Sequence, residues 1–384
     1  MILISIVLII ICCLIIWRAS DGFEAASEYL GRNLSEGVRG ATINAIGSSM
    51  PELFTTLFFL FVLKDKDGFS GGIGTTAGSA IFNGMIIPAV VILVVILKGL
   101  TSYVEVSKKV LLRDGISLLV CELVLIFILG GNTLNWIHGL ILMGLYAGYA
   151  SYMLLSMKAV ESEEGQEQAE EQEEGEEDKG NSFINLFTLN LEPVFIKKEI
   201  NTKNAWMLLL FSMLIIGSAC LLLVKSCEWL GDDLNIPIYF IAVILASAAT
   251  SVPDTILSMK DAKKGNYDDA VSNALGSNIF DVCFALGLPL FIFTIIYGPI
   301  TMSPETVTNV SELRILLFIF TFIAFIIYIT KRKMNIVSAI LLLLLYVLFT
   351  VYVLGRSMES ETATEISLWI KSINNVIDGY RFWK

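Results

Sequence analysis

The chain has 384 residues, of which 55% are hydrophobic and 16% are charged, and its mean hydropathy is +0.73. A soluble domain carries about a quarter charged residues, so this composition excludes an ordinary water-soluble enzyme. The formal charge is −11, and the block from Glu161 to Gly180 alone contributes −10 of it, which also excludes the basic face that nucleic-acid binding requires. The pattern is typical of an all-α polytopic membrane protein with one acidic insert.

Ten apolar segments predict ten transmembrane helices, since a bilayer core of about 30 Å needs about 20 apolar residues in a helix. The first segment has no basic n-region and no strong cleavage site, so we interpret it as a retained span rather than a signal peptide. In chain order the segments are 2–18, 38–63, 71–97, 110–130, 134–157, 205–227, 236–259, 268–297, 313–330 and 334–355. They divide the chain into a five-helix half (1–157), an acidic loop (158–203), a second five-helix half (204–355) and a tail (356–384).

Basic residues predict the orientation, because they concentrate in cytoplasmic connections. Placing both termini outside leaves few of them there: Lys64, Lys66 and Lys225, with Arg314 at a helix start. We therefore expect an integral protein of the cell membrane, with the acidic loop in the cytoplasm. Residues 161–180 have too few apolar side chains to fold alone and predict a solvated linker. An apolar stripe in the tail (Ile366, Leu368, Trp369, Ile373, Ile377) predicts an interfacial helix.

Two short motifs occur twice and in the same order. Residues 47–56 (GSSMPELFTT) recur as 249–258 (ATSVPDTILS), and residues 78–83 (GSAIFN) recur as 276–281 (GSNIFD). A weaker echo precedes each pair, EYLG at 28–31 and EWLG at 228–231. Because an odd number of spans, five, separates each copy from its partner, the halves cross the membrane in opposite directions. The sequence therefore predicts two inverted five-helix repeats, which in many transporters place the substrate site near the midplane.

Three carboxylates in the motifs, those of Glu52, Asp254 and Asp281, lie deep in apolar spans. Each costs roughly 2.5–3.5 kcal/mol at a helix centre, and no Lys or Arg occurs mid-span to pair with them. A bound cation or a proton must neutralise them. An all-oxygen set of neighbours suits Ca²⁺ or Na⁺ rather than a soft metal. The neutral oxygen donors beside the carboxylates are Ser48, Ser49, Ser79, Asn83, Thr250, Ser251 and Ser277.

Proline and glycine in the motifs predict the local helix geometry. Pro51 and Pro253 each remove a backbone donor, so we expect each helix to break beside its carboxylate. Gly78 and Gly276 predict close helix contacts that bring spans 3 and 8 against spans 2 and 7.

Other reactive residues indicate no second site. The six cysteines have no CxxC spacing and are expected to be reduced packing residues. The single histidine, His138, is interpreted as a packing or interfacial residue. Glu122 lies in a span but has no repeat partner, which favours a structural role. We expect no cofactor and no obligate protein partner; the partners are the lipid bilayer and the transported ions.

At the repeated motifs the chain resembles the cation/calcium exchanger superfamily, specifically the sodium/calcium exchangers, whose two alpha-repeats read approximately G-[ST]-S-x-P-E/D and G-S-x-x-[FV]-[ND]. The resemblance covers roughly 20–157 and 205–355, and it assigns the alpha-repeats to about 42–97 and 245–297. It implies a 5+5 antiporter that exchanges Na⁺ for Ca²⁺ while helices 1 and 6 slide past a rigid core. It also implies that Glu52 and Asp254 are the central Ca²⁺ ligands. Ser48, Ser49, Thr250 and Ser251 would add oxygens, and Ser79, Asn83, Ser277 and Asp281 would complete the flanking Na⁺ sites.

Several alternatives stay open from the sequence. Asp281 takes the place in the second repeat that Asn83 has in the first, and this pattern resembles potassium-dependent exchangers. Coupling to K⁺ therefore stays open. A proton/calcium exchanger would usually carry a G-N-x-x-E core, which residues 47–52 do not match. An intramembrane aspartyl protease using Asp254 and Asp281 would need these residues in Tyr-Asp and Gly-x-Gly-Asp motifs, but Asp254 follows a proline and Asp281 follows a phenylalanine. A channel is a further alternative, but coupled transport fits inverted repeats better. The chain departs from the family pattern at Ala249, where glycine is usual, and in the Lys64–Asp67 insertion.

Overall fold

The computed structural model describes residues 1–32, 40–63, 69–161, 185, 188–196, 200–331 and 333–378. Helices make up nearly all of these residues. The acidic block from residue 162 onward and the Lys64–Asp67 insertion lie outside the described residues, so the expectations for them stay predictions.

The first half consists of helical segments in the predicted order, and its second segment is interrupted. This interrupted segment begins with a π-helical turn, η1, and continues as two short α-helices. The elements are α1 (Ile2–Leu30), η1 (Gly40–Asn44), α3 (Ala45–Ser48), α4 (Met50–Phe61), α5 (Ser70–Leu97), α6 (Lys108–Ile128) and α7 (Trp136–Glu161).

The second half follows the same plan, with π-helical turns η2 and η3 in its second and third segments. A one-turn helix, α9 (Glu192–Phe195), precedes it. The elements are α10 (Thr202–Leu234), α11 (Ile238–Ile241), η2 (Ala242–Ala246), α12 (Ser247–Thr250), α13 (Val252–Lys264), α14 (Tyr267–Phe280), η3 (Asp281–Ala285), α15 (Leu286–Tyr297), α16 (Pro304–Thr330), α17 (Ile336–Ser357) and α18 (Glu361–Asp378).

The predicted helical membrane architecture is confirmed, and length and composition support eight of the ten predicted spans. In the described part of the chain, eight helical stretches are long and apolar enough to cross a membrane. The segment predicted at 38–63 is built of short pieces, of which the longest is Met50–Phe61. The segment predicted at 110–130 is the helix α6, but Arg113, Asp114 and Glu122 interrupt its apolar character.

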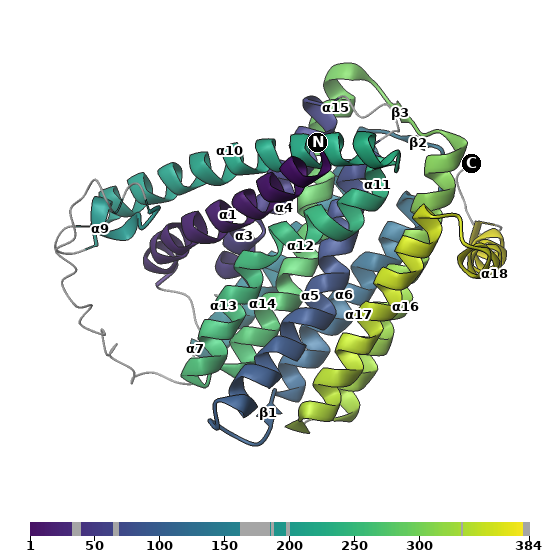
Figure 1. Ribbon diagram of the computed structural model, residues 1–384. Coiled ribbons are helices and arrows are strands. Elements are labelled where there is room, and N and C mark those ends of the chain that lie inside the picture. Colours follow the sequence, from purple (N-terminus) through teal and green to yellow (C-terminus); the bar gives the residue numbers. More distant parts are fainter. Residues whose placement is uncertain are drawn as a thin grey trace.

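Two short antiparallel strand pairs join the halves at opposite ends of the molecule. β1 (Val104–Glu105) pairs with β4 (Lys333–Met334), and β2 (Thr133–Leu134) pairs with β3 (Ile300–Thr301). Both chain termini lie toward the end that carries β2 and β3, while β1 lies at the other end (Figure 1). Each pair takes one strand from each half, which is the arrangement expected of two halves that cross the molecule in opposite directions.

The helices α1 and α10 lie side by side and run obliquely across the bundle formed by the remaining long helices (Figure 1). Their contact is apolar, since Cys12 and Ile16 of α1 and Ile216 and Leu223 of α10 are buried in the same core. Helix α1 continues to Leu30, twelve residues beyond the span predicted at 2–18. This extension keeps small residues such as Ala19 and Ala26 buried, so packing prolongs the helix past its most apolar part.

Helix α5 is the central element and contacts the broken segments of both halves. A Cβ atom added at Gly78 would lie 2.3 Å from the carbonyl oxygen of Val243 and 2.9 Å from the Cβ of Ser247. Glycine is therefore required where α5 crosses η2 and α12. The close contact predicted at Gly78, between the third and seventh spans, is confirmed.

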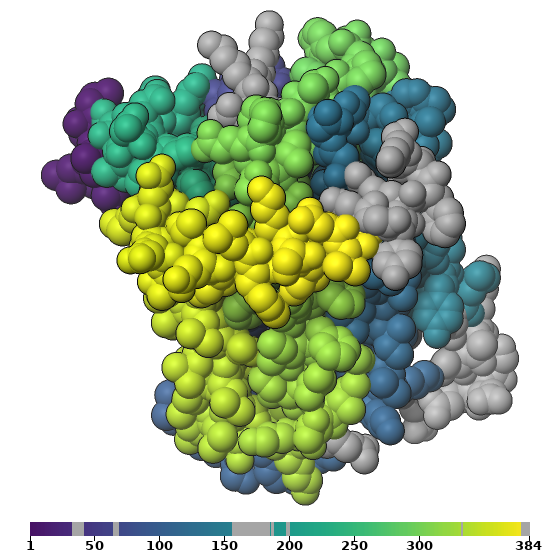
Figure 2. All heavy atoms as spheres, turned by 90° about the vertical axis from the view of Figure 1, so that its right-hand side faces the viewer, coloured from purple at the N-terminus to yellow at the C-terminus, as the bar shows by residue number. Residues whose placement is uncertain are grey.

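The tail forms the predicted helix, α18, which lies across the faces of the preceding helices (Figure 2). Polar contacts dock it there, because Ser367 donates to Glu312 and Arg314 donates to Asn374. Ile366, Leu368 and Trp369 remain exposed, whereas Ile373 is half-buried and Ile377 packs against the core, so only the first part of the apolar stripe faces away from the protein. An interfacial position for this stripe stays a prediction.

Candidate cation site

Both copies of the proline-containing motif interrupt their helices where the sequence predicts. In the first half α3 ends at Ser48, Ser49 leaves the helical conformation with φ −93° and ψ 9°, and α4 starts with Pro51 in its first turn. In the second half Ser251 has φ −80° and ψ 1°, and α13 starts with Pro253 in its first turn. Proline has no N–H to continue the preceding hydrogen-bond ladder, so each helix restarts at this point.

The breaks place two carboxylates at helix N-termini inside the protein. Glu52 lies in the first turn of α4 and Asp254 in the first turn of α13, and both side chains are fully buried. The N-terminal end of a helix carries partial positive charge, which stabilises an anion. The π-helical turns η1 and η2 each lie one short helix before the break in their half, and the third π-helical turn, η3, begins at Asp281. Such turns often mark functional sites.

Ser79 of α5 gathers the first group of site residues. Its Oγ lies 3.0 Å from Glu52 Oε1, 3.0 Å from Asp281 Oδ2 and 2.8 Å from Ser251 Oγ. A hydroxyl has one proton to donate, so it can satisfy one of these carboxylates at a time. Glu52 Oε1 and Asp281 Oδ2 each lie 3.0 Å from the same hydroxyl oxygen. The distance between these two carboxylate oxygens is therefore at most twice that value. Two like charges at this separation in a dry interior need a cation or a proton between them.

Asp254 gathers the second group. Its Oδ1 accepts a hydrogen bond of 2.6 Å from Ser277 Oγ, and its Oδ2 accepts one of 3.2 Å from Asn83 Nδ2. The Ser48 and Ser277 hydroxyl oxygens are 3.5 Å apart. Asn83 Nδ2 also reaches Ser79 Oγ at 3.4 Å, so the two groups form one connected network. Ser79 with Glu52, and Ser277 with Asp254, repeat the same contact in the two halves.

Four oxygens of the predicted residues are buried and have no hydrogen-bond partner among the described residues: Ser49 Oγ, Glu52 Oε2, Asn83 Oδ1 and Asp281 Oδ1. No ion pair connects Glu52, Asp254 or Asp281 to a Lys or Arg in the described ranges. Uncompensated oxygens in an apolar interior are costly, and a cation would satisfy them. Within the same ranges, no three His, Cys, Asp or Glu side chains come close enough together to hold a metal ion by themselves, since hydroxyls and amides separate the carboxylates.

The structure joins eight of the ten predicted residues directly in this network, and the other two, Thr250 and Ser49, lie beside its carboxylates Glu52 and Asp281. Thr250 Oγ1 also donates to the Ser247 carbonyl at 3.1 Å, and Ser49 Oγ is buried at the break. Glu122 accepts a hydrogen bond of 2.8 Å from Thr321 on α16, as suits a structural residue. His138 caps the start of α7, where its Nδ1 accepts from the Asn135 N–H.

The sequence analysis did not predict two asparagines that lie near the network. Asn273 donates to Ser258 Oγ at 3.1 Å and keeps a buried Oδ1 without a partner. Asn44 has the same unpartnered oxygen, and its carbonyl accepts from Ser48 Oγ at 2.8 Å. Each lies four residues before a predicted serine, Ser277 or Ser48, so one helical turn of spacing is the signal that could have identified them.

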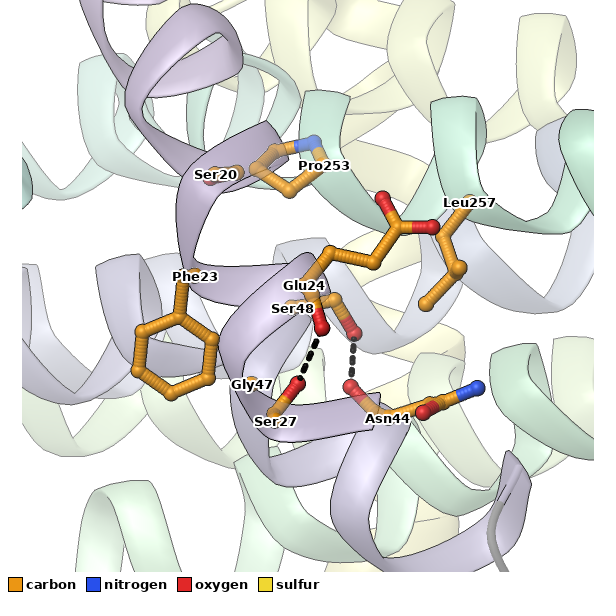
Figure 3. Close-up of a pocket in the computed structure, with 9 residues that line it drawn as sticks. All are labelled: Ser20, Phe23, Glu24, Ser27, Asn44, Gly47, Ser48, Pro253 and Leu257. Atoms are coloured by element: carbon orange, nitrogen blue, oxygen red, sulfur yellow. Dashed lines mark hydrogen bonds between the residues drawn. The ribbon is translucent and has the colours of Figure 1, made fainter. Parts of the chain in front are cut away.

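A pocket opens beside this network between α1, the η1–α3 segment and α13 (Figure 3). Ser48 belongs both to the pocket lining and to the network. Glu24 extends from α1 toward Leu257 of α13, and Asn44 lies on the opposite wall (Figure 3). The pocket therefore lies directly beside the Ser48 end of the network.

Comparison with known families relates both halves to one family. The family described as sodium/calcium exchanger protein matches residues 4–155 and 204–355, which together exceed three quarters of the chain. Each half matches separately, in agreement with the internal repeat.

Individual relatives carry related names. Sodium/potassium/calcium exchanger 5 of Homo sapiens is 28% identical over 407 residues, covering 86% of this chain and 79% of the relative. Sodium/potassium/calcium exchanger Nckx30C of Drosophila melanogaster is 35% identical over 124 residues, 32% of this chain and 14% of the relative. The matched part of that second relative is therefore a small fraction of its length.

Two solved structures share the fold. The sodium-calcium exchanger NCX_Mj, soaked with 100 mM Na⁺ and 10 mM Sr²⁺, gives a TM-score of 0.56 at 22% identity and covers 91% of this chain and 98% of its own. An H⁺/Ca²⁺ exchanger, CAX, gives a TM-score of 0.59 at 13% identity and covers 97% of this chain and 91% of its own.

Proposed function

The chain belongs to the sodium/calcium exchanger protein family, and from that premise we propose that it exchanges Na⁺ for Ca²⁺ by alternating access at the network around Ser79 and Asp254. Membership in a family of transporters excludes the alternative that the chain is an intramembrane aspartyl protease. The proposed ion ligands are Ser48, Ser49, Glu52, Ser79, Asn83, Thr250, Ser251, Asp254, Ser277 and Asp281.

One observation carries the proposal. Glu52 and Asp281 both lie 3.0 Å from the single hydroxyl of Ser79, while Asp254 is held by neutral donors. Three buried carboxylates in one hydrogen-bonded network, with no basic partner among the described residues, need mobile positive charge. Ca²⁺ binds six to eight oxygens with flexible geometry, and the broken helices supply carboxylate, hydroxyl and amide oxygens from both halves.

The same cluster would couple the two ion fluxes. Carboxylates that have lost their cation are costly to move through an apolar barrier, so an empty site resists the transition between inward and outward states. Ca²⁺ and several Na⁺ ions would compete for overlapping oxygens, and either load would neutralise the site. In this proposal α1 and α10, the oblique helices, slide past the bundle to alternate access.

The proposed orientation follows the distribution of basic residues. Both termini face outward, the acidic loop faces the cytoplasm, and the protein resides in the cell membrane. The pocket would then open inward, since Glu24 and Lys260 lie toward the predicted cytoplasmic ends of their helices.

Potassium coupling is a second candidate, favoured by Asp281. This third buried carboxylate shares Ser79 with Glu52 and supplies charge for an additional monovalent cation. The human and Drosophila relatives are named sodium/potassium/calcium exchangers.

The deciding experiment is uptake of radioactive Ca²⁺ into liposomes that contain the purified protein and are loaded with Na⁺, with the K⁺ and pH gradients varied independently. We expect uptake to increase with the outward Na⁺ gradient at constant pH, and to increase further with K⁺ on the Ca²⁺ side if K⁺ is cotransported. Uptake that ignores internal Na⁺ and follows a proton gradient would contradict the proposal.

A further inference from the structure

The pocket beside the network contains oxygen atoms that ion coordination at the network does not use. Its wall on α1 carries Glu24, whose side chain is 21% exposed. Its opposite wall carries Asn44, which is 6% exposed and has an Oδ1 atom without a hydrogen-bond partner in the described structure. A carboxylate facing an unsatisfied amide oxygen across a pocket suits a cation, because both groups are acceptors of the kind that Ca²⁺ and Na⁺ bind.

Ser48 connects this pocket to the central carboxylates. It lines the pocket, its Oγ lies 3.5 Å from Ser277 Oγ, and Ser277 donates to Asp254 Oδ1 at 2.6 Å. Oxygen donors thus continue from the pocket to Asp254. A cation that entered beside Glu24 would meet a polar partner at each step.

A lysine already neutralises the mouth of the pocket. Lys260 Nζ of α13 lies 2.9 Å from Glu24 Oε2 and 2.9 Å from Asp21 Oδ1, both on α1. Its side chain is 39% exposed, so solvent reaches the ammonium and it can leave without crossing the protein. Asp21 and Glu24 share this one lysine, so its charge is divided between two carboxylates.

We propose that Glu24, Asn44 and Ser48 form an access site for the transported cation, Ca²⁺ or Na⁺, and that Lys260 occupies its mouth as a displaceable competitor. The proposal rests on the exchange function proposed above. An incoming cation replaces the ammonium beside Glu24, Lys260 stays with Asp21, and the cation passes through Asn44 and Ser48 to Asp254.

The repeat makes the access site one-sided. At the offset of the EYLG echo Glu24 corresponds to Val224, and at the offset of the GSSMPE motif Asn44 corresponds to Ala246 and Lys260 to Phe58. None of these three counterparts can bind a cation through its side chain. Substitutions in the access site should therefore change the apparent ion affinity on one face of the membrane.

The test measures the half-saturating Ca²⁺ concentration separately at each face, in proteoliposomes of known orientation at low ionic strength. A negatively lined cleft raises local cation concentration by roughly tenfold or more. We therefore expect Glu24→Gln to raise the half-saturating Ca²⁺ concentration at the pocket face roughly tenfold. Lys260→Met removes the competitor and should lower that concentration by a similar factor. Neither variant should change the value at the opposite face, and added salt should reduce both effects.

Glu228→Gln is the matched control, since it removes a carboxylate from another lysine pair, with Lys225 Nζ at 2.9 Å, on α10. We expect it to change neither value. Shifts in the same direction for Glu24→Gln and Lys260→Met, or equal shifts at both faces, would show that the ion pair only holds α1 against α13 and would overturn the proposal. Absence of Na⁺-driven uptake in the wild-type protein would instead overturn the exchange function itself.

Discussion

The pocket-lining helix α1 and its counterpart α10 occupy related positions in the two halves but present different side chains. At an offset of 200 residues, three polar residues of α1 that line the pocket correspond to three residues of α10 that are completely buried. The pairs are Ser20 with Cys220, Glu24 with Val224, and Ser27 with Cys227. Helix α10 also packs closely along α4, whereas α1 contacts the equivalent helix α13 over a shorter length.

The central network shows much less difference between the halves. Ser79 contacts Glu52 at 3.0 Å in one half, and Ser277 contacts Asp254 at 2.6 Å in the other. The comparison teaches that the proposed ion ligands follow the repeat, while the flanking helices differ in the side chains that they place beside the network. Polar side chains of α1 line the pocket there, whereas apolar or thiol side chains occupy the related positions along α10 and are completely buried.

The largest expected effect tests the symmetry of the network. Glu52→Gln and Asp254→Asn should each abolish Na⁺-driven Ca²⁺ uptake while the protein still inserts, because each removes a charged ligand. Loss of a group that only supports a metal ligand already weakens binding roughly 10–100-fold. Glu122→Gln is the control, since a glutamine oxygen can still accept from Thr321. Normal uptake in either site variant would exclude that residue from ion binding.

A second prediction concerns the joint between the halves at Gly78. Gly78→Ala places a Cβ atom against the Val243 carbonyl oxygen, and such overpacking costs about 1–3 kcal/mol. We expect a clear loss of thermal stability in detergent. Gly144→Ala on α7 meets no atom within 4 Å and should leave the melting temperature nearly unchanged. Equal stability of the two variants would mean that α5 can move away from η2 without loss.

A third prediction compares the two flanking helices through thiol chemistry. The wild-type chain already carries Cys227, fully buried on α10, at the position related to Ser27 in the pocket lining. Ser27 is 5% exposed and lines the pocket, so a small, charged thiol reagent should label Ser27→Cys slowly from the pocket face and leave Cys227 unlabelled, since reaction needs an accessible thiolate. Equal labelling of both positions would contradict the proposed difference in accessibility between α1 and α10.

The smallest expected effect concerns the pair formed by Lys225 and Glu228 on α10. Their side chains are 36% and 34% exposed, and exposed pairs of this kind stabilise proteins by about 0–1 kcal/mol. Lys225→Met should therefore change the unfolding temperature very little. A large decrease in the unfolding temperature would indicate that this ion pair, rather than the buried apolar contacts of α10, holds the helix in place.

Local chemistry explains how much of the site the sequence predicted. Proline beside a buried carboxylate constrains the backbone within one turn, so both helix breaks lie where Pro51 and Pro253 indicate. Repetition identified the proposed ligands of both halves. Asn273 was missed because its position one helical turn before Ser277 indicates a site residue only once its burial is known. Helix ends were also misjudged: α16 begins at Pro304 rather than near residue 313, because Glu312 and Arg314 are buried against α18 and not exposed to lipid.

The sequence by itself determined the membrane class, the two related halves, and the three acids whose charge an apolar segment cannot hold alone, since each follows from composition, repetition or covalent geometry. The tertiary structure alone decided which oxygens meet at Ser79, why Gly78 must be glycine, and that Lys260 reaches Glu24 from a helix more than 200 residues away. Such contacts depend on how distant helices pack, and packing is a property of the whole fold. The acidic block dominates the net charge, yet the charges that matter to the proposed function are the few that packing isolates from water.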